Sequence, residues 1–594
     1  METEHRANYF ELEEDEADVD IGNFGVPYDE TQPGPVIDEA ALIAVQQQLA
    51  QQAAFAQIPN DVKRFILQFH QAILNNNVAE INSAYEGGWS KLTEKYYAKI
   101  EWPEAELIAP LVEDDQVFLT LYRELYYRHV YSRLQPDVDD RFHSYENSCE
   151  LFNYILNSDE PVPLNLPEQW LWDIVDEFIY QYQNFCAWRS KAKQRTEEDV
   201  TLLAEGGSQI WSTYSVLNVL YSLIQKSKIN EQLNAAKEGK SAEEIEEVAG
   251  DFGSKPLYKA LGYFSIIGLL RVHVLLGDFT LALKVMDSIE LTPKAFFTRV
   301  TACHVATYYY VGFCYLSLRR YPDANRTFVN VLNFVSRMRP YHTRSYQYDQ
   351  INKMADRMYA LLALGITMSP TRLDENTMIG LKERVGEQYG KLQRGEYESG
   401  AFEELFMFAC PKFIASQPPP YEDLALLEKY KAQPPIEPAA RHLAIFLQDV
   451  RALQPVQTLR TMLKLYTSLD AAKLANFLDQ DEETLVQQLM ALKLASRSVS
   501  RAGIEGGKLL DGETISTSDT DFAINDNVVK IVESTIGRRY GSLFIRNTEY
   551  AERIFDNLKS SPLPKPKSAD GSAPAAPEKK PAAEKKAKVG WAKV

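Results

Sequence analysis

The stretch that decides the fold is residues 456–532, which begins VQTLRTMLKLYTSLDAAKLANFLDQDEETLVQQLMALKLA (456–495) and ends DFAINDNVVKIV (521–532). Its leucines recur at intervals of three and four residues, which predicts three short helices, each with one apolar face. Asp479 stands three residues before Glu482, the spacing of a capping box, so the third helix is predicted to begin there. The inward-facing residues are predicted to be Leu459, Met462, Leu463 and Tyr466, then Leu474, Ala475 and Leu478, then Leu485, Val486, Leu489 and Leu492.

A glycine-rich break follows these helices, from Gly503 to Gly512. Two short runs of alternating apolar and polar residues come next, 521–525 and 528–533, and this alternation predicts two strands. Three helices followed by a two-stranded wing predict a winged-helix domain. Domains of this kind bind nucleic acid or, in large assemblies, other proteins, and the pattern by itself leaves that choice open.

The chain upstream is predicted to be helical, with no strand before residue 520. Helical spacing of apolar residues begins at Pro59, and a wide aromatic stripe from Trp170 to Phe185 fits either a core or an interface. Segments 262–290 and 304–332 align with each other, and each predicts two helices joined by a tight turn. The sequence therefore predicts a mainly α fold, a tetratricopeptide-like helical-repeat superhelix ending in a winged helix and a C-terminal helix.

Shifts in composition predict the boundaries between these parts. Both ends of the chain are biased in composition, acidic and Gln-rich at the start and Lys/Pro-rich at the end, which predicts disordered tails. The predicted parts are a tail at 1–57, an N-terminal helical domain at 58–227, a polar linker or insertion at 228–255, a repeat array at 256–453, a winged helix at 454–535 (within a module of about 325–535), a C-terminal helix at 536–560 and a tail at 561–594.

The composition excludes several classes of protein. The net charge of −20 disfavours a protein that covers nucleic-acid phosphates along its length. Five scattered cysteines without a CxxC pattern argue against a disulfide framework and for a reducing compartment. The acidic first twenty residues have the wrong charge for a signal or transit peptide, and the most apolar run, Leu261–Leu270, is too short to span a membrane. We expect a soluble, cytoplasmic protein.

No catalytic, cofactor or metal site is predicted, and no small-molecule substrate. The cluster of Cys303, His304 and Cys314 is the nearest approach to a ligand set, but its apolar neighbours predict buried packing. The run Gly503–Lys508 has one residue too few between its glycines for a phosphate-binding loop, and Leu509 stands where a Ser or Thr would bind magnesium. We therefore expect a protein that is not an enzyme.

Basic residues around the predicted winged helix are the candidates for contact with RNA. Collected on one face they could meet phosphates, whereas the plainer reading is a solvated surface. The predicted third helix starts with acidic residues, which argues against sequence-specific reading of DNA. The candidate RNA contacts are Lys493, Arg497, Arg501, Arg538, Arg539 and Arg546.

A helical-repeat array that ends in a winged helix and a terminal helix resembles the PCI family, the scaffold subunits of the proteasome lid, the COP9 signalosome and translation initiation factor 3. Within that family, several segments resemble the subunit L branch of eukaryotic initiation factor 3. They include WSKLTEK (89–95), WPEAE (102–106), LFNYILN (151–157), QWLWDI (169–174) and RRYG (538–541).

The resemblance implies a non-catalytic core subunit. Its partners would be the other PCI and MPN subunits of initiation factor 3, and through the complex the small (40S) ribosomal subunit, where initiator tRNA and mRNA are recruited. Assembly would use edges of the winged helix and a bundle of C-terminal helices. By position, the candidate assembly residues are Phe522, Ile524, Val528, Val529 and Ile531 in the wing, and Phe544, Phe555 and Leu558 in the last helix.

Two other functions stay open at this point. One is a PCI scaffold subunit of the proteasome lid or the COP9 signalosome, which would require the segment matches before residue 200 to be coincidental. The other is a stand-alone RNA-binding winged-helix protein, which predicts tight, salt-sensitive binding to RNA by the isolated chain.

Overall fold

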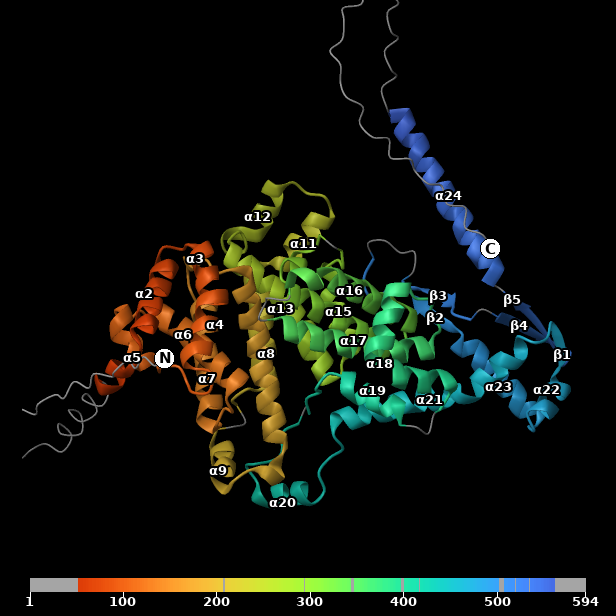
Figure 1. Ribbon diagram of the computed structural model, residues 1–594, viewed down its shortest axis with the longest axis horizontal. Coiled ribbons are helices and arrows are strands. Elements are labelled where there is room, and N and C mark those ends of the chain that lie inside the picture. Colours follow the sequence, from red (N-terminus) through yellow and green to blue (C-terminus); the bar gives the residue numbers. More distant parts are fainter. Residues whose placement is uncertain are drawn as a thin grey trace, which may run out of the picture.

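The computed structural model describes residues 52–206, 209–292, 294–342, 347–396, 400–415, 417–501, 507–518, 520–533 and 535–560. These residues form an elongated molecule, with an N-terminal helical domain at one end, a helical array in the middle and a winged helix at the other end (Figure 1). The predicted disordered tails lie outside the described residues, except that 52–57 are helical, so described structure begins before the predicted boundary at residue 58.

The N-terminal domain is built around one long aromatic helix, α8. Its indole Trp170 stacks on Phe69 and Tyr85, with ring centroids 5.5 and 5.0 Å apart, and Trp170, Val175, Tyr182 and Phe185 are fully buried. The aromatic stripe is therefore core. The elements are α2 (Asn60–Leu74), α3 (Val78–Ser83), η1 (Ala84–Trp89), α4 (Ser90–Tyr96), α5 (Ala105–Ile108), η2 (Ala109–Val112), α6 (Gln116–Arg133), α7 (Val138–Leu156), α8 (Glu168–Ser190), η3 (Ala192–Gln194), α9 (Glu197–Glu205) and α10 (Thr213–Ser227).

The polar segment 228–255 is an inserted pair of helices, one of the two forms the sequence allowed, and not an exposed loop. It forms α11 (Ile229–Lys237) and α12 (Ala242–Gly253). The buried Gln232 side chain donates to the carbonyls of Ser227 and Gly253, at 2.7 and 3.1 Å. The insertion is thereby fastened to the end of α10.

The predicted internal repeat is present in the array. Its two units turn at Gly277 and Arg319, both with positive φ, and the small Ala282 and Ala324 that follow are completely buried. Helix α13 is long and apolar enough to cross a membrane, but 89% of its most apolar 18-residue stretch is buried in the core. The elements are α13 (Pro256–Leu276), α14 (Phe279–Val285), η4 (Met286–Ser288), η5 (Phe296–Arg299), α15 (Thr301–Ser317), α16 (Tyr321–His342), α17 (Tyr348–Met368), α18 (Glu375–Arg394) and α19 (Ala401–Ala409).

One continuous helix, α21 (Pro438–Leu463), joins the array to the winged helix. It follows α20 (Leu424–Ala432), which lies in the Pro-rich segment after the array. Near its start, Phe446 and Val450 pack in the core of the array, whereas Leu459 and Leu463 near its end pack in the core of the winged helix. The boundary placed from the sequence at residues 453 and 454 therefore falls within a single helix.

The winged helix contains three strands that the sequence analysis missed. They are β1 (Ser468–Asp470), β2 (Arg497–Ser500) and β3 (Glu513–Ser516). Each has only three or four residues, too few for an alternating pattern to stand out. The predicted wing strands are present as β4 (Thr520–Asn525) and β5 (Val528–Glu533). One sheet has the order β1-β5-β4, and β2 pairs with β3 in a second.

The helices of the domain follow the prediction except at one cap and at Tyr466, which was predicted to face inward but lies beyond the end of α21 and is 39% exposed. They are α22 (Ala471–Phe477) and α23 (Glu482–Ala495), and Leu474, Leu485 and Leu489 are fully buried as predicted. The proposed capping box was wrong, because Asp481 occupies the N-cap position of α23. Asp479 lies in the preceding turn with a φ of 50°.

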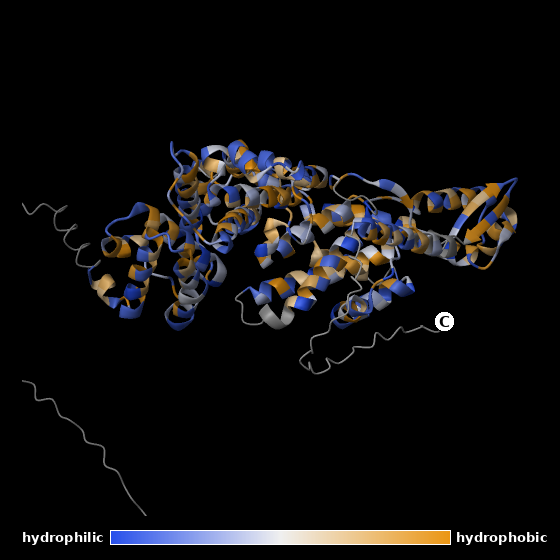
Figure 2. Cartoon of the chain, turned by 90° about the horizontal axis from the view of Figure 1, so that it is seen from above, coloured by the Kyte–Doolittle hydropathy of each residue, from blue (hydrophilic) through white to orange (hydrophobic). Residues whose placement is uncertain are grey.

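The wing itself is a tight antiparallel hairpin. Asn525 faces Val528 and Phe522 faces Ile531. The two connecting residues, Asp526 and Asn527, both have positive φ, as a type I′ turn requires. Polar and apolar residues alternate along β4, whereas β5 is mostly apolar, and both colours are seen in the sheet at the winged-helix end of the chain (Figure 2). Helix α24 (Thr535–Ser560) follows β5 and projects away from the body of the molecule (Figure 1).

Charged groups are buried where η1, α6 and α8 meet. The Arg128 guanidinium donates to the Glu124 carboxylate and to the Tyr85 hydroxyl, and it lies 3.7 Å from the Asp173 carboxylate. One turn further along α8, burial raises the pKa of Glu177 to about 7, although Arg128 and a hydrogen bond from Gln181 oppose that rise. Glu177 therefore changes its charge near neutral pH.

This pKa predicts a pH-dependent stability. The unfolded chain releases the Glu177 proton near pH 4.5, whereas the folded protein holds it to about pH 7, so this carboxyl weakens folding progressively as the pH rises between those values. Glu177→Gln should therefore gain stability relative to the unaltered protein as the pH rises, by about 2 kcal/mol between pH 5.5 and pH 8. Urea unfolding at the two pH values measures this. A stabilisation that did not grow with pH, or that the exposed Glu146→Gln on α7 reproduced, would contradict it.

Candidate assembly surfaces

The side chains predicted to mediate assembly through the wing lie largely inside the domain. Phe522, Val529 and Ile531 belong to the core of the winged helix, where they pack with leucines from α21, α22 and α23. Ile524 packs partly against the same core, and Val528 is half-buried. Strand alternation turns Phe522, Ile524, Val529 and Ile531 toward this core, so these four side chains do not themselves form an outer face, whereas Val528 lies on the opposite side of β5 from Val529.

What the wing leaves open is the backbone edge of its outer strand. Strand β5 lies between β1 and β4, so Val528, Val529 and Ile531 sit on a strand that is paired on both sides. Among the described residues, no strand pairs with the outer side of β4. Such an edge presents unpaired N–H and C=O groups that another strand can extend. The buried wing residues would support this edge by holding β4 flat against the core.

The second sheet fastens the winged helix to the array. Arg320, at the turn between α15 and α16, donates to the carbonyls of Leu510 and Asp511 at 2.7 and 2.8 Å. It also pairs with Asp323 at 2.7 Å, and both side chains are more than 90% buried. Asp323 in turn accepts hydrogen bonds from the Ser500 hydroxyl and the Arg501 amide, at 2.8 and 3.0 Å. We call the Arg320–Asp323 pair and these contacts the latch.

Packing reinforces the latch. Leu509 is 2% exposed and belongs to the core of the array, not to that of the winged helix. The Tyr315 hydroxyl donates to the Leu509 carbonyl at 2.9 Å. At Gly512 a Cβ atom would lie 2.6 Å from Val499 and 3.0 Å from Arg320, so only glycine allows the strand to approach. The winged helix is thereby held at two places, through α21 and through the latch.

Helix α24 carries an apolar face that packs against no other element among the described residues. Phe544, Phe555 and Leu558, the residues predicted from the sequence, are 68%, 64% and 69% exposed. At 100° per residue, Tyr540 and Ile554 fall on the same side of the helix, and Glu549, Arg553 and Asp556 fall opposite. Since an isolated helix of this kind gains most of its stability from packing, α24 has the form of a segment that is completed by another helix.

Comparison with known proteins decides the family. The family model described as RNA polymerase I-associated factor PAF67 matches residues 140–551. Proteins called eukaryotic translation initiation factor 3 subunit L resemble the chain over most of its length. The protein from Mycosarcoma maydis is 56% identical to this chain, in an alignment that covers 86% of this chain and 75% of the relative. The protein from Nematostella vectensis is 48% identical, with 85% of this chain and 93% of the relative covered. The human protein is 42% identical, with 87% of this chain and 93% of the relative covered.

The chain belongs to the eukaryotic translation initiation factor 3 subunit L family. This confirms the resemblance drawn from the residue segments before 200 and from 538–541. The members are subunits of an initiation factor, and among the described residues of this one no group of three His, Cys, Asp or Glu side chains could hold a metal ion. Cys303, His304 and Cys314 are buried in α15, and burial lowers the pKa of His304 to about 4.

In this member of the subunit L family, the candidate RNA contacts do not share one role. The Lys493 amine donates to the Phe522 carbonyl at 2.5 Å, and the Arg501 guanidinium donates to the Gly507 carbonyl, so both serve the local structure. Arg497 on β2 and Arg546 on α24 are exposed. The side chains of Arg538 and Arg539 lie outside the described part of the chain, as does most of the run 503–508.

Sequence reasoning found the turn at residues 319 and 320 but not the latch. Nothing in the local pattern links Arg320 to carbonyls about 190 residues later, because a buried ion pair is recognised only when the chain is folded. The one available signal was the pair of charged residues, Arg320 and Asp323, next to an otherwise apolar repeat helix.

The latch predicts a local effect of substitution. Asp323→Ala leaves the buried Arg320 guanidinium without its carboxylate, which is costly by about 3–5 kcal/mol where no rearrangement relieves it. We expect residues 507–516 to detach, so that their amide hydrogens exchange at least tenfold faster, while those of α13 stay protected. Hydrogen–deuterium exchange of the full chain measures both.

A neighbouring ion pair provides the control. Arg319 pairs with Asp449 at 2.7 Å, but the arginine is 67% exposed, and such pairs contribute little. Asp449→Ala should therefore leave the exchange of residues 507–516 unchanged. Equal exchange in the two variants would show that the buried pair does not hold the second sheet.

Proposed function

We propose that the protein is a non-catalytic scaffold subunit of initiation factor 3 that works in the cytoplasm. Through the complex it would take part in binding the 40S ribosomal subunit and in recruiting initiator tRNA and mRNA. The observation that carries this proposal is the apolar face of α24, held out from the body by a winged helix that is fixed at two places. Membership of the subunit L family supplies the complex in which such a face would be covered.

The energetics favour a protein partner for α24. Burial of a large apolar side chain contributes about 1.5–3 kcal/mol, and the face of α24 offers several exposed ones, including Phe544, Phe555 and Leu558. Its opposite face carries charges of both signs, with Arg546 and Arg553 close to Glu549 and Glu552. A mixed-charge face gives no preference for phosphates, so helix packing is the stronger use of this segment.

The edge of β4 supports a second contact with a sibling subunit. Pairing of an added strand would use the backbone and would need the wing to keep its position, which the latch provides. Direct contact with RNA through the exposed Arg497 and Arg546 stays a prediction. The relatives reported above are subunits of initiation factor 3, and this favours that complex over the proteasome lid, the signalosome and an RNA-binding protein that acts alone.

Removal of the apolar face tests the proposal. A tagged chain with Phe544→Asp and Phe555→Asp, or one lacking residues 536–560, should lose co-purification with the other subunits of initiation factor 3 by at least tenfold. On a sucrose gradient of the extract it should move from the small-subunit fractions to the position of a free protein. Because neither change touches the two cores, the circular dichroism of the purified variants should show an intact array.

A polar-face variant is the matched control. Glu549→Ala with Asp556→Ala changes two exposed residues of the same helix on its other side, and should co-purify as the unaltered protein does. Stoichiometric co-purification of the truncated chain would show that α24 is not an assembly helix. Migration of the unaltered chain with subunits of the proteasome lid would overturn the proposed complex.

A further inference from the structure

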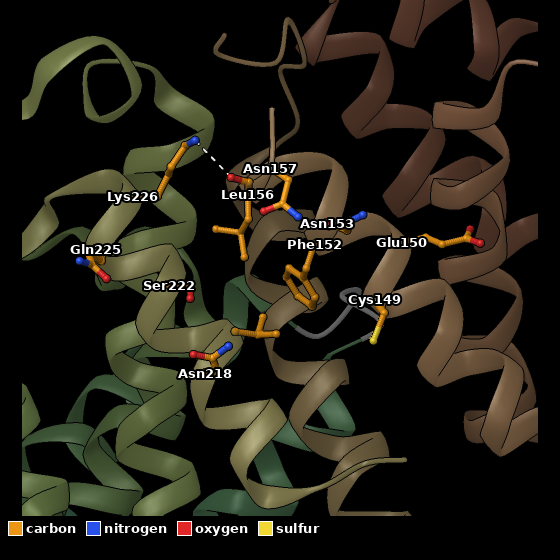
Figure 3. Close-up of a pocket in the computed structure, with 11 residues that line it drawn as sticks. Cys149, Glu150, Phe152, Asn153, Leu156, Asn157, Asn218, Ser222, Gln225 and Lys226 are labelled. Atoms are coloured by element: carbon orange, nitrogen blue, oxygen red, sulfur yellow. Dashed lines mark hydrogen bonds between the residues drawn. The ribbon is translucent and has the colours of Figure 1, made fainter. Parts of the chain in front are cut away.

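A groove runs along the N-terminal domain between α7 and α10, far from the wing and α24. Its volume is about 670 Å³. Figure 3 shows Phe152 and Leu156 of α7 beside Asn218 and Ser222 of α10. Lining residues span 149–157 on one helix and 218–226 on the other, so the groove is about 12 Å long.

Amide side chains line both walls. Asn153 on α7 and Asn157 at its C-cap lie one turn apart, and the Asn157 amide donates to the side-chain carbonyl of Asn153, whose own amide N–H groups stay available; Asn218 and Gln225 lie two turns apart on α10. All four are exposed. An amide side chain offers both a donor and an acceptor, and among the described residues no hydrogen-bond partner is recorded for the side chains of Asn218 and Gln225. Between the two rows, Phe152, Leu156 and Val219 provide an apolar floor.

The two charged residues of the groove are engaged and opposite in sign. The Lys226 amine donates to the carbonyls of Leu156 and Ser158 at 3.2 and 3.1 Å. The Glu150 carboxylate lies 3.7 Å from the Arg123 guanidinium. A groove without spare positive charge is unsuited to phosphate or nucleic acid, so its ligand should be neutral and rich in both donors and acceptors.

The main chain of an extended peptide has this chemistry. Each residue carries one N–H and one C=O group that must be satisfied on burial, and alternate residues repeat at about 7 Å. Side chains one helical turn apart, such as Asn153 and Asn157, repeat at about 6 Å and can follow alternate residues, whereas Asn218 and Gln225 are about 10 Å apart along α10. About four extended residues fill 12 Å, and the apolar floor would accept a small aliphatic side chain.

We propose that the α7/α10 groove is a docking site for an extended segment of a sibling subunit, held by its main chain. The inference rests on the proposed function, since that complex supplies the partner. The groove and the wing lie at opposite ends of the molecule (Figure 1), so the chain would connect two neighbours. Asn153 and Asn218 would bond the peptide from the two sides.

Overlapping 12-residue synthetic peptides that cover the other subunits of initiation factor 3, together with peptides that cover residues 1–51 of this chain, provide the probe. The full chain should bind at least one of them, measured by fluorescence anisotropy. The double variant Asn153→Ala with Asn218→Ala should bind that peptide with an affinity at least tenfold lower. The matched control, Asn234→Ala, removes an exposed amide on α11 outside the groove and should bind normally. N-methylation of one central peptide bond should weaken binding as strongly as the double variant does.

The outcomes separate this inference from the proposed function. The double variant keeps the wing and α24, so it should still co-purify with initiation factor 3. If the double variant co-purifies and the unaltered chain binds no peptide, the groove is not a docking site and the proposed function stands. The same conclusion follows if the two groove substitutions leave the affinity for every bound peptide unchanged. If only peptides from residues 1–51 of this chain bind, the occupant of the groove is a segment of the chain itself, and the proposal of a sibling subunit is contradicted. If the unaltered chain binds no peptide and the double variant no longer co-purifies with the complex, the two substitutions disturb assembly in another way, and the groove proposal is contradicted.

Discussion

The buried pair of Arg320 and Asp323 is the interaction on which the arrangement of this protein depends. A charge buried without a partner is strongly unfavourable, so each of the two requires the other and also requires polar groups from residues 500–511 to complete its hydrogen bonds. Those groups exist at this place only when the second sheet of the winged helix lies against α15 and α16. Because the buried pair is satisfied only in this arrangement, it fixes the position of the winged helix relative to the array.

That position matters because the features available for assembly lie beyond it. The edge of β4 belongs to the winged helix, and its direction is set by α21 and by the latch together, while α24 follows β5 at the same end of the molecule. A single helical connection would allow the domain to pivot about one axis, whereas two separated attachments leave no simple rotation. The scaffold role that we propose needs such rigidity, since a subunit that contacts several neighbours must present its surfaces at constant angles.

The sequence predicted much of the fold because its patterns are local. Helical spacing of apolar residues and the alignment of segments 262–290 and 304–332 located the repeat units. It failed where the determining contact was distant or the element was short. Strands β1, β2 and β3 carry too few residues for a pattern, and the cap of α23 was misplaced because two acidic residues two positions apart offer the same chemistry.

The candidate site shows the same division. Exposure of Phe544, Phe555 and Leu558 followed from the amphipathic pattern of the last helix. Phe522, Val529 and Ile531 were chosen as contact residues because they are apolar and lie in the wing, but strand alternation can serve an outer face or a core equally well. Lys493 and Arg501 were grouped with the surface bases, although each donates to a backbone carbonyl that comes near only after folding.

By itself, the sequence determined the fold class, the order of the parts, the family and the amphipathic last helix, because these depend on residue spacing along the chain. Only the tertiary structure decided which side of the wing faces inward, how the winged helix is fixed to the array and where a groove opens between α7 and α10. These depend on groups that are far apart in the chain and meet through burial, where the desolvation of charges and the filling of space select one arrangement.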